Sequence, residues 1–136
     1  DFPATAYGAS GFDLGNSASS SYFNVLLNTP KGITNSIVLF QFKEDEDGNG
    51  TFNEDNEDMY SLELKGLDEG WQVVSIKYED LKSLKNGAPS TPKGNGVYNP
   101  DKLHTLSCLF LADPKTGYSR TLMDYIIFTK DEALKL

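Results

Sequence analysis

The chain has few of the residues on which catalysis and disulfide frameworks depend. Among its 136 residues there is one Cys, Cys108, and one His, His104. A single Cys excludes an internal disulfide. A lone His, with no nucleophile and acid at a recognisable spacing, matches none of the usual catalytic motifs. The sequence therefore predicts a protein that is not an enzyme.

Long apolar runs and an excess of basic charge are missing as well. No segment approaches the ~20 apolar residues that span a bilayer, and the opening residues lack the basic and apolar regions of a signal peptide. Because the chain opens without Met, we interpret its start as a mature end or an excised domain. With 12 basic against 20 acidic residues there is no basic stripe, which argues against nucleic acid as a partner.

Acidic charge is concentrated in one segment. Residues 44–58 hold eight acidic side chains, and outside them the twelve acidic residues that remain balance the twelve basic ones. The whole formal charge of −8 therefore lies in this segment. Such a concentration repels itself unless it is solvated or neutralised by cations.

Alternation of apolar and polar residues predicts an all-β fold. The expected strands are residues 22–28, 36–43, 59–64, 71–78, 103–112 and 121–129. The Asn49-Gly50 pair supplies turn chemistry between the second and third of them. Six strands with frequent turn signals are typical of an antiparallel β-sandwich. We expect an irregular lead-in over 1–21 with a short strand near 11–14, the sandwich over 22–130, and a tail over 131–136.

The connections and the core follow from the same pattern. We expect single helical turns at 78–84 and 99–102, and no regular structure in the Gly- and Pro-rich residues 86–96. The predicted core is Phe23, Val38, Phe40, Leu62, Val74, Ile76 and Phe110.

Several short motifs resemble a known family. In chain order they are the insertion KEDEDGNGTF (43–52), WQVVSIKYEDL (71–81), the loop GNGVYNP (94–100) and a final strand with Asp between apolar residues (LMDYIIFT, 122–129). In that order they resemble jelly-roll carbohydrate-binding modules of the galactose-binding-like type, as in surface glycan-binding lipoproteins of gut Bacteroidetes. The resemblance covers roughly 22–130. It implies a jelly-roll β-sandwich, non-catalytic polysaccharide binding and an extracellular or cell-surface location.

The acidic segment begins as a calcium-binding loop. Asp45, Asp47 and Asn49 occupy positions 1, 3 and 5 of the pattern, and Gly50 occupies position 6. Position 12 is Asn56 in place of Glu, and strands flank the loop, so it is not an EF-hand. Two interpretations stay open. Either Asp55 or Glu57 closes an irregular calcium site, or the segment is a solvated hairpin tip.

Asp124 is a second candidate for a metal site. By alternation it shares the inward face with Leu122 and Phe128, where a carboxylate needs a partner. In the modules that the chain resembles, an Asp here often holds a structural calcium with residues near the N-terminus, which makes Asp13 its candidate partner. The alternative is a carboxylate that accepts backbone N–H bonds.

A sugar-binding surface would need aromatic rings beside polar groups. The faces opposite the predicted core offer Tyr22, Asn24, Gln41, Lys43 and Trp71, and the last turn adds Tyr118 and Arg120. In the modules that the chain resembles, the Trp at this place more often packs than binds ligand.

Two hypotheses from different classes follow. The first is a non-catalytic carbohydrate-binding domain of a larger extracellular protein, with calcium as structural support. The second is a structural or adhesive spacer domain of a cell-surface protein, without a glycan site.

Overall fold

The computed structural model describes residues 2–3, 14, 17–33, 36–112 and 120–135. Its strands are β1 (Phe2–Pro3), β2 (Ser21–Thr29), β3 (Ile37–Glu44), β4 (Met59–Lys65), β5 (Gly70–Lys77), β6 (Leu84–Lys85), β7 (Ala88–Pro89), β8 (Leu103–Leu111) and β9 (Leu122–Lys130). Two 3-10 turns, η2 (Tyr78–Asp80) and η3 (Pro100–Lys102), complete the described elements. All six predicted strands are confirmed, with ends that differ by one residue at most.

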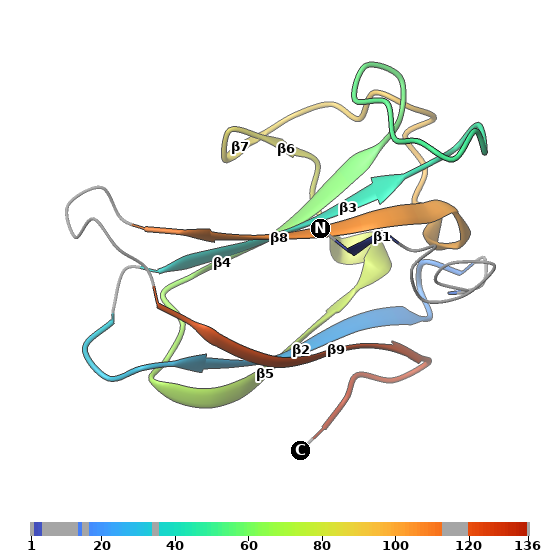
Figure 1. Cartoon of the computed structure of the whole chain (residues 1–136). Helices are drawn as coiled ribbons and strands as arrows, with labels where there is room; N and C mark the ends of the chain where they lie inside the picture. Colours follow the sequence, from blue (N-terminus) through green and yellow to red (C-terminus); the bar gives the residue numbers. More distant parts are fainter. Residues whose placement is uncertain (1, 4–13, 15–16, 34–35, 113–119, 136) are drawn as a thin grey trace.

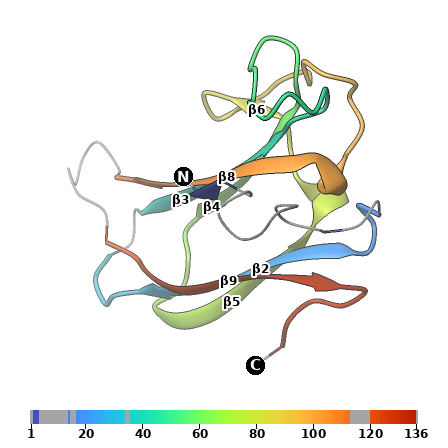
Figure 2. The same cartoon turned by 45° about the vertical axis from the view of Figure 1, so that its right-hand side comes forward.

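Seven of the described strands form two sheets that face each other (Figures 1 and 2), and β6 and β7 form a separate two-stranded sheet. One sheet has the order β1-β8-β3-β4, and the other has the order β5-β2-β9. Each pairing between described strands is antiparallel. The prediction of an antiparallel β-sandwich is therefore confirmed. No described helix is long and apolar enough to cross a membrane.

The core lies between the two sheets and is rich in aromatic rings. In β3, the residues Val38, Phe40 and Phe42 point inward and are fully buried. From the opposite sheet, Phe23 packs on Phe40 at 4.9 Å and edge-to-face on Phe42 at 5.1 Å between ring centroids. Burial of each such side chain contributes about 1.5–3 kcal/mol to the free energy of unfolding. A slip of β3 by one residue would turn these side chains outward, so their burial fixes the register in which β3 pairs.

Two expectations about the fold were wrong. Phe110 was predicted in the core but is 45% exposed, as are its neighbours Leu109 and Leu111 to similar extents. The backbone of β8 pairs with β3 as far as Leu111, but the facing sheet does not cover the last residues of β8. Their side chains are therefore exposed although their backbone is paired. Residues 86–96 also contain regular structure, since β6 and β7 pair around a turn with Asn86 and Gly87 at positive φ.

The two predicted helical turns are present as η2 and η3. Pro100 stands at the start of η3, where its missing N–H costs nothing. The short strand expected near 11–14 lies outside the described residues except for Leu14, which packs against the core. In the tail, the Leu134 N–H donates to Asn24 Oδ1, so these last residues return to the sheet.

Candidate functional site

Three segments meet at one end of the sandwich. They are the 45–58 connection between β3 and β4, the β6–β7 hairpin, and residues 90–99, all at the top of Figure 1. The β3–β4 hairpin extends one step beyond the strands, because the Glu44 N–H donates to the Asp58 carbonyl at 3.0 Å. The 45–58 connection therefore leaves and returns at the end of two paired strands.

The predicted calcium loop folds around Asp45. Its Oδ1 accepts the N–H groups of Gly48 at 2.8 Å and Asn49 at 3.1 Å, and its Oδ2 accepts that of Gly50 at 2.7 Å. Gly50 adopts a φ of +85°, which an L side chain rarely adopts and which brings its N–H back to Asp45. Asp47 Oδ1 accepts the Asn49 N–H at 2.9 Å. The sequence pattern thus produces a tight turn with carboxylates on its inner side.

Glu57 closes this loop. Its Oε1 accepts the Glu46 N–H at 3.0 Å and lies 3.5 Å from the Asp47 nitrogen, and its Oε2 accepts the Asn53 N–H at 2.6 Å. One oxygen each of Asp45, Asp47 and Glu57 lie within 4.8 Å of one another. These three carboxylates could hold a metal ion, and we call them the loop cluster. Of the two proposed closing residues, Glu57 belongs to it and the exposed Asp55 does not.

Asp45 of the loop cluster is surrounded by backbone donors. Burial opposes ionisation of Asp45, but the backbone N–H groups of Gly50, Gly48 and Asn49 outweigh it, and they hold the pKa of Asp45 below its usual value. Asn49 turns its own Oδ1 to the Thr51 N–H and hydroxyl, at 2.9 and 2.6 Å. Asn49 therefore braces the turn from its exposed side.

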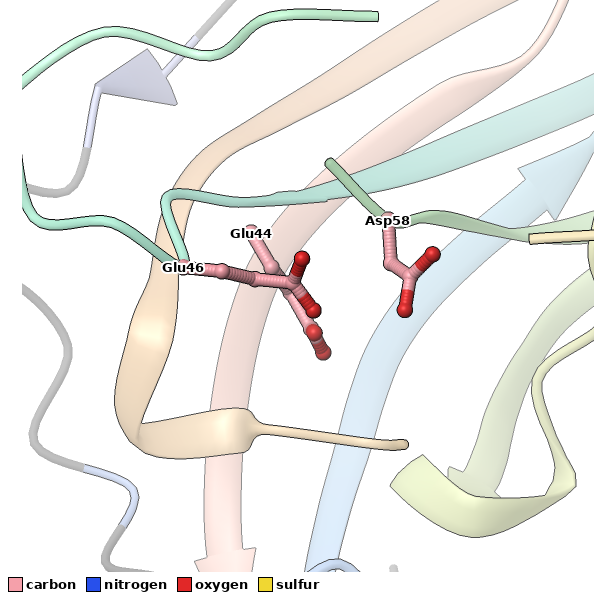
Figure 3. Close-up of side chains that lie close together, drawn as sticks. All are labelled: Glu44, Glu46 and Asp58. Atoms are coloured by element: carbon pink, nitrogen blue, oxygen red, sulfur yellow. The ribbon is translucent and has the colours of Figure 1, made fainter. Parts of the chain in front are cut away.

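A second carboxylate cluster was not predicted. One oxygen each of Glu44, Glu46 and Asp58 also lie within 4.8 Å of one another, and Figure 3 shows the three side chains converging from the two ends of the connection. We call them the inner cluster. The alternation of β3 could have indicated this cluster, because Glu44 follows Val38, Phe40 and Phe42 on the inward face of the strand.

Glu44 is fully buried. Its Oε1 accepts the Tyr78 hydroxyl and the Asn99 N–H, each at 2.9 Å. Its Oε2 is buried and has no hydrogen-bond partner among the described residues. Burial raises the pKa of Glu44 to about 8; the two hydrogen bonds oppose the shift, and the charges of Asp58 and Glu46 add to it.

Residues 94–99 wrap the inner cluster with backbone N–H groups. Asp58 accepts the N–H of Gly94 at 2.6 Å and of Gly96 at 2.7 Å. Glu46 accepts the Asn95 N–H with both oxygens, at 3.2 and 3.3 Å. A Cβ at Gly94 would collide with the Glu46 carboxylate and crowd the Asp58 nitrogen, so only Gly permits this approach.

A pocket of about 440 Å³ lies beside the loop cluster. One wall comes from β3, β4 and the acidic connection, and the other from residues 83–93 around the β6–β7 hairpin. The lining combines carboxylates, lysines, hydroxyls and amides with one aromatic ring: Gln41, Phe52, Glu54, Asp55, Glu57, Met59, Ser83, Leu84, Lys85, Asn86, Ser90, Thr91, Pro92 and Lys93.

Two predicted ligand residues lie at this pocket. Gln41 lines it, and the Lys43 ammonium lies 5.9 Å from the ring centroid of the pocket residue Phe52. Sequence reasoning missed Phe52 and the whole opposite wall, because the wall comes from the segment predicted to lack structure.

Other predicted ligand residues lie elsewhere. Trp71, at the start of β5, is 54% exposed and opposes Asn28 of β2. Tyr22 lies on the same face of that sheet, and the Lys77 ammonium lies 5.9 Å from its ring centroid. Arg120 is exposed before β9, and Tyr118 lies outside the described residues. The structure thus does not bring Trp71 and Tyr22 to the pocket that Gln41 lines.

Asn24 is a structural residue, which corrects its prediction as a surface ligand. It is fully buried. Its amide donates to the Ile127 carbonyl at 3.0 Å and the Thr129 hydroxyl at 2.9 Å, and its Oδ1 accepts the Ser75 hydroxyl at 2.6 Å. Because the Leu134 N–H also covers Asn24 Oδ1, the side chain has no group left for a ligand.

The inward placement of Asp124 was also wrong. Asp124 is exposed, because the pairing of β2 with β9 shifts register between Val25 and Leu27 and the alternation of β9 slips at Asp124–Tyr125. An exposed carboxylate needs no buried partner, which removes the reason for placing an ion there. Its proposed partner Asp13 lies outside the described residues.

The two residues considered for catalysis have ordinary surroundings. His104 Nδ1 is paired with the hydroxyl of the adjacent Thr105 at 2.8 Å. Cys108 packs against the core, and burial raises the pKa of its thiol to about 11, so it is a poor nucleophile at neutral pH.

Comparison with known proteins adds no relative: no family model, no curated protein and no solved structure matches the chain. What can be concluded about function therefore depends on the geometry of this end of the sandwich.

Proposed function

We propose that this domain binds carbohydrate without catalysis, in the pocket between the acidic connection and the β6–β7 hairpin. We further propose that a calcium ion in the loop cluster supports the wall that carries Phe52. The resemblance to carbohydrate-binding modules led to the same function, and the pocket gives it a specific surface.

The composition of the pocket supports this proposal. Sugars present C–H faces that stack on aromatic rings and hydroxyl edges that need donors and acceptors. Phe52 offers the ring. Gln41 and Asn86 offer amides, and Ser90 and Lys93 add a hydroxyl and an ammonium within the same pocket. This convergence of one ring with several polar groups is the single observation on which the proposal rests most.

Calcium is the cation that the loop cluster suits best. Its ligands are hard carboxylate oxygens, and Asn49 Oδ1 could join them only by releasing its bonds to the Thr51 N–H and hydroxyl. Backbone oxygens and water could complete a coordination of six to eight oxygens. Modules outside the cell bind calcium with dissociation constants of about 10⁻⁴ to 10⁻³ M. We accordingly propose an extracellular or cell-surface location, as part of a larger protein.

Affinity gel electrophoresis against a panel of plant and host polysaccharides tests the function. We expect the wild-type chain to be retarded by at least one polysaccharide when Ca²⁺ is present. Phe52→Ala should abolish this retardation, and Gln41→Ala should reduce it. Trp71→Ala is the matched control, because it removes an exposed ring from the other sheet and should bind as the wild type does.

The outcomes separate the two hypotheses. If Trp71→Ala abolishes binding and Phe52→Ala does not, the glycan surface lies on the β5-β2-β9 sheet and the pocket is excluded. If no polysaccharide retards the wild-type chain, the carbohydrate-binding proposal fails, and the alternative of a spacer domain is favoured.

A further inference from the structure

Among the described residues, no cationic side chain pairs with the three carboxylates of the inner cluster. Among the described residues there are two ion pairs, Lys65–Glu63 and Lys77–Glu79, and neither includes Glu44, Glu46 or Asp58. Three converging carboxylates with no cationic side chain repel one another, and the repulsion is strong where water is excluded.

The second observation is the buried oxygen of Glu44. The whole residue is inaccessible to solvent, and Oε2 has no hydrogen-bond partner in the described part of the chain. An unpaired buried oxygen of this kind is rare, and a missing ion is one of its ordinary explanations. Glu44 belongs to the set whose oxygens approach within 4.8 Å, so an ion bound there would also contact Glu46 and Asp58.

The surroundings of the cluster resemble the outer shell of a metal site. Ligating carboxylates are usually oriented by hydrogen bonds from groups that do not touch the metal. Here Asn99 N–H and Tyr78 hydroxyl hold Glu44, while Gly94 and Gly96 N–H groups hold Asp58. All of these donors are fixed by backbone or by a buried ring, so the carboxylates are positioned before any ion binds.

We propose that Glu44, Glu46 and Asp58 form a second divalent-cation site, distinct from the loop cluster. The site is built from hard oxygen ligands and suits Ca²⁺. It joins the end of the β3–β4 hairpin to residues 94–99, beside the contact between the rings of Tyr98 and Tyr60 of β4, whose centroids lie 4.3 Å apart. This inference does not depend on carbohydrate binding.

The rival occupant is a proton. The proton could be held by Glu44, whose pKa is raised by burial, or shared between Glu46 and Asp58. In either place it would relieve part of the repulsion, but it would leave Glu44 Oε2 without a hydrogen-bond partner among the described residues. A divalent cation would remove both the repulsion and the unpaired oxygen, because it neutralises two negative charges and coordinates Glu44 Oε2.

Calorimetric titration of the chelator-treated full chain with Ca²⁺ tests the proposal. We expect two binding events in the wild type, one for each cluster. Glu44→Gln should lose one event and Asp47→Asn the other. Glu54→Gln is the matched control, since it makes the same change on an exposed residue of the connection outside both clusters, and it should keep both events.

Terbium emission identifies which event belongs to the inner cluster. Tyr78 and Tyr60 donate their hydroxyls to Glu44 and Asp58, at 2.9 and 3.3 Å, so Tb³⁺ bound there lies beside two tyrosine rings that can sensitise it. Glu44→Gln should remove most of the sensitised emission, and Asp47→Asn should keep most of it. If Glu44→Gln does not fold, Asp58→Asn provides the same comparison.

Several results would overturn the inference. A wild type that binds a single ion, lost in Asp47→Asn and kept in Glu44→Gln, leaves only the loop cluster as a calcium site. Two binding events that both survive in Glu44→Gln and Asp58→Asn also contradict it, as does a wild type that binds no Ca²⁺. Polysaccharide retardation is measured separately, so failure of one proposal does not decide the other.

Discussion

The loop cluster and the inner cluster are formed by alternate residues of the same segment. Asp45 and Asp47 turn toward the acidic connection itself, whereas Glu44 and Glu46 turn toward Asp58 and residues 94–99. The loop cluster receives its hydrogen bonds from N–H groups within twelve residues along the chain, whereas the inner cluster receives many of them from thirty to fifty-five residues away. The comparison shows that one extended segment can supply a locally built site and a tertiary one.

Burial separates the two clusters energetically. The loop cluster is open to water at Asp47, and backbone donors hold the pKa of Asp45 below its usual value. The inner cluster contains the fully buried Glu44, whose carboxyl has a raised pKa. We expect changes in the inner cluster to alter stability more, because a buried group cannot replace a lost partner with water.

Asp58→Ala should give the largest effect. It removes the acceptor of the Gly94 and Gly96 N–H groups, and leaving two such donors unpaired should cost about 3 kcal/mol of unfolding free energy. Urea denaturation in the presence of a chelator measures this loss. The matched control is Asp47→Ala, at an exposed position, which should cost less than about 1 kcal/mol. Equal losses in the two variants would contradict the distinction between the clusters.

Removal of calcium should give the next effect. An ion that binds only the folded chain stabilises it by about 2.7 kcal/mol at one hundred times its dissociation constant. We therefore expect a chelator to lower the melting temperature of the wild type. The decrease should be smaller in Glu44→Gln and in Asp47→Asn, and absent when both substitutions are combined. A melting temperature that does not respond to the chelator would exclude both sites.

Gly94→Ala tests the close approach of residues 94–99 to the inner cluster. The added methyl group would collide with the Glu46 carboxylate, and we expect a cost of about 1–3 kcal/mol. In a Glu46→Ala background the collision with the carboxylate should disappear, but part of the cost should remain, because the methyl group would still lie 2.9 Å from the Asp58 backbone nitrogen, which cannot move aside as a side chain can. The double-mutant cycle in urea denaturation gives the coupling. Additive effects would show that the two residues do not meet.

Asn49→Ala should give the smallest effect. It removes two hydrogen bonds to Thr51 on an exposed turn, so the free energy of unfolding in chelator should change by about 0.5 kcal/mol or less. The same variant should weaken calcium binding by the loop cluster if Asn49 contributes a ligand oxygen. Calorimetry with Asn49→Ala and Asp47→Asn side by side makes this comparison, and unchanged affinity in Asn49→Ala would remove Asn49 from the ligand set.

The sequence pattern anticipated contacts that are local. Asp45 and Asp47 come together with Glu57, one of the two closing residues left open, because a short loop brings its own carboxylates to its own N–H groups. Prediction failed at Asn24 and Asp124. Asn24 is covered by the tail, and Asp124 is turned outward by a register shift between β2 and β9. Neither feature can be predicted from the alternation of apolar and polar residues.

Local sequence patterns were enough to predict the strands, the sandwich and the position of the acidic loop. Alternation and turn residues depend only on residues close together in the chain. In a pleated strand, successive side chains point to opposite faces, so an alternating pattern directly indicates a strand with one buried face. The tertiary structure was needed to show that the inward row of β3 ends in a buried carboxylate, Glu44, beside Asp58. It was also needed to show that residues 83–93 and Phe52 line one pocket. Both depend on where distant loops close over the end of the core, which is fixed by packing between segments and not by the pattern within any of them.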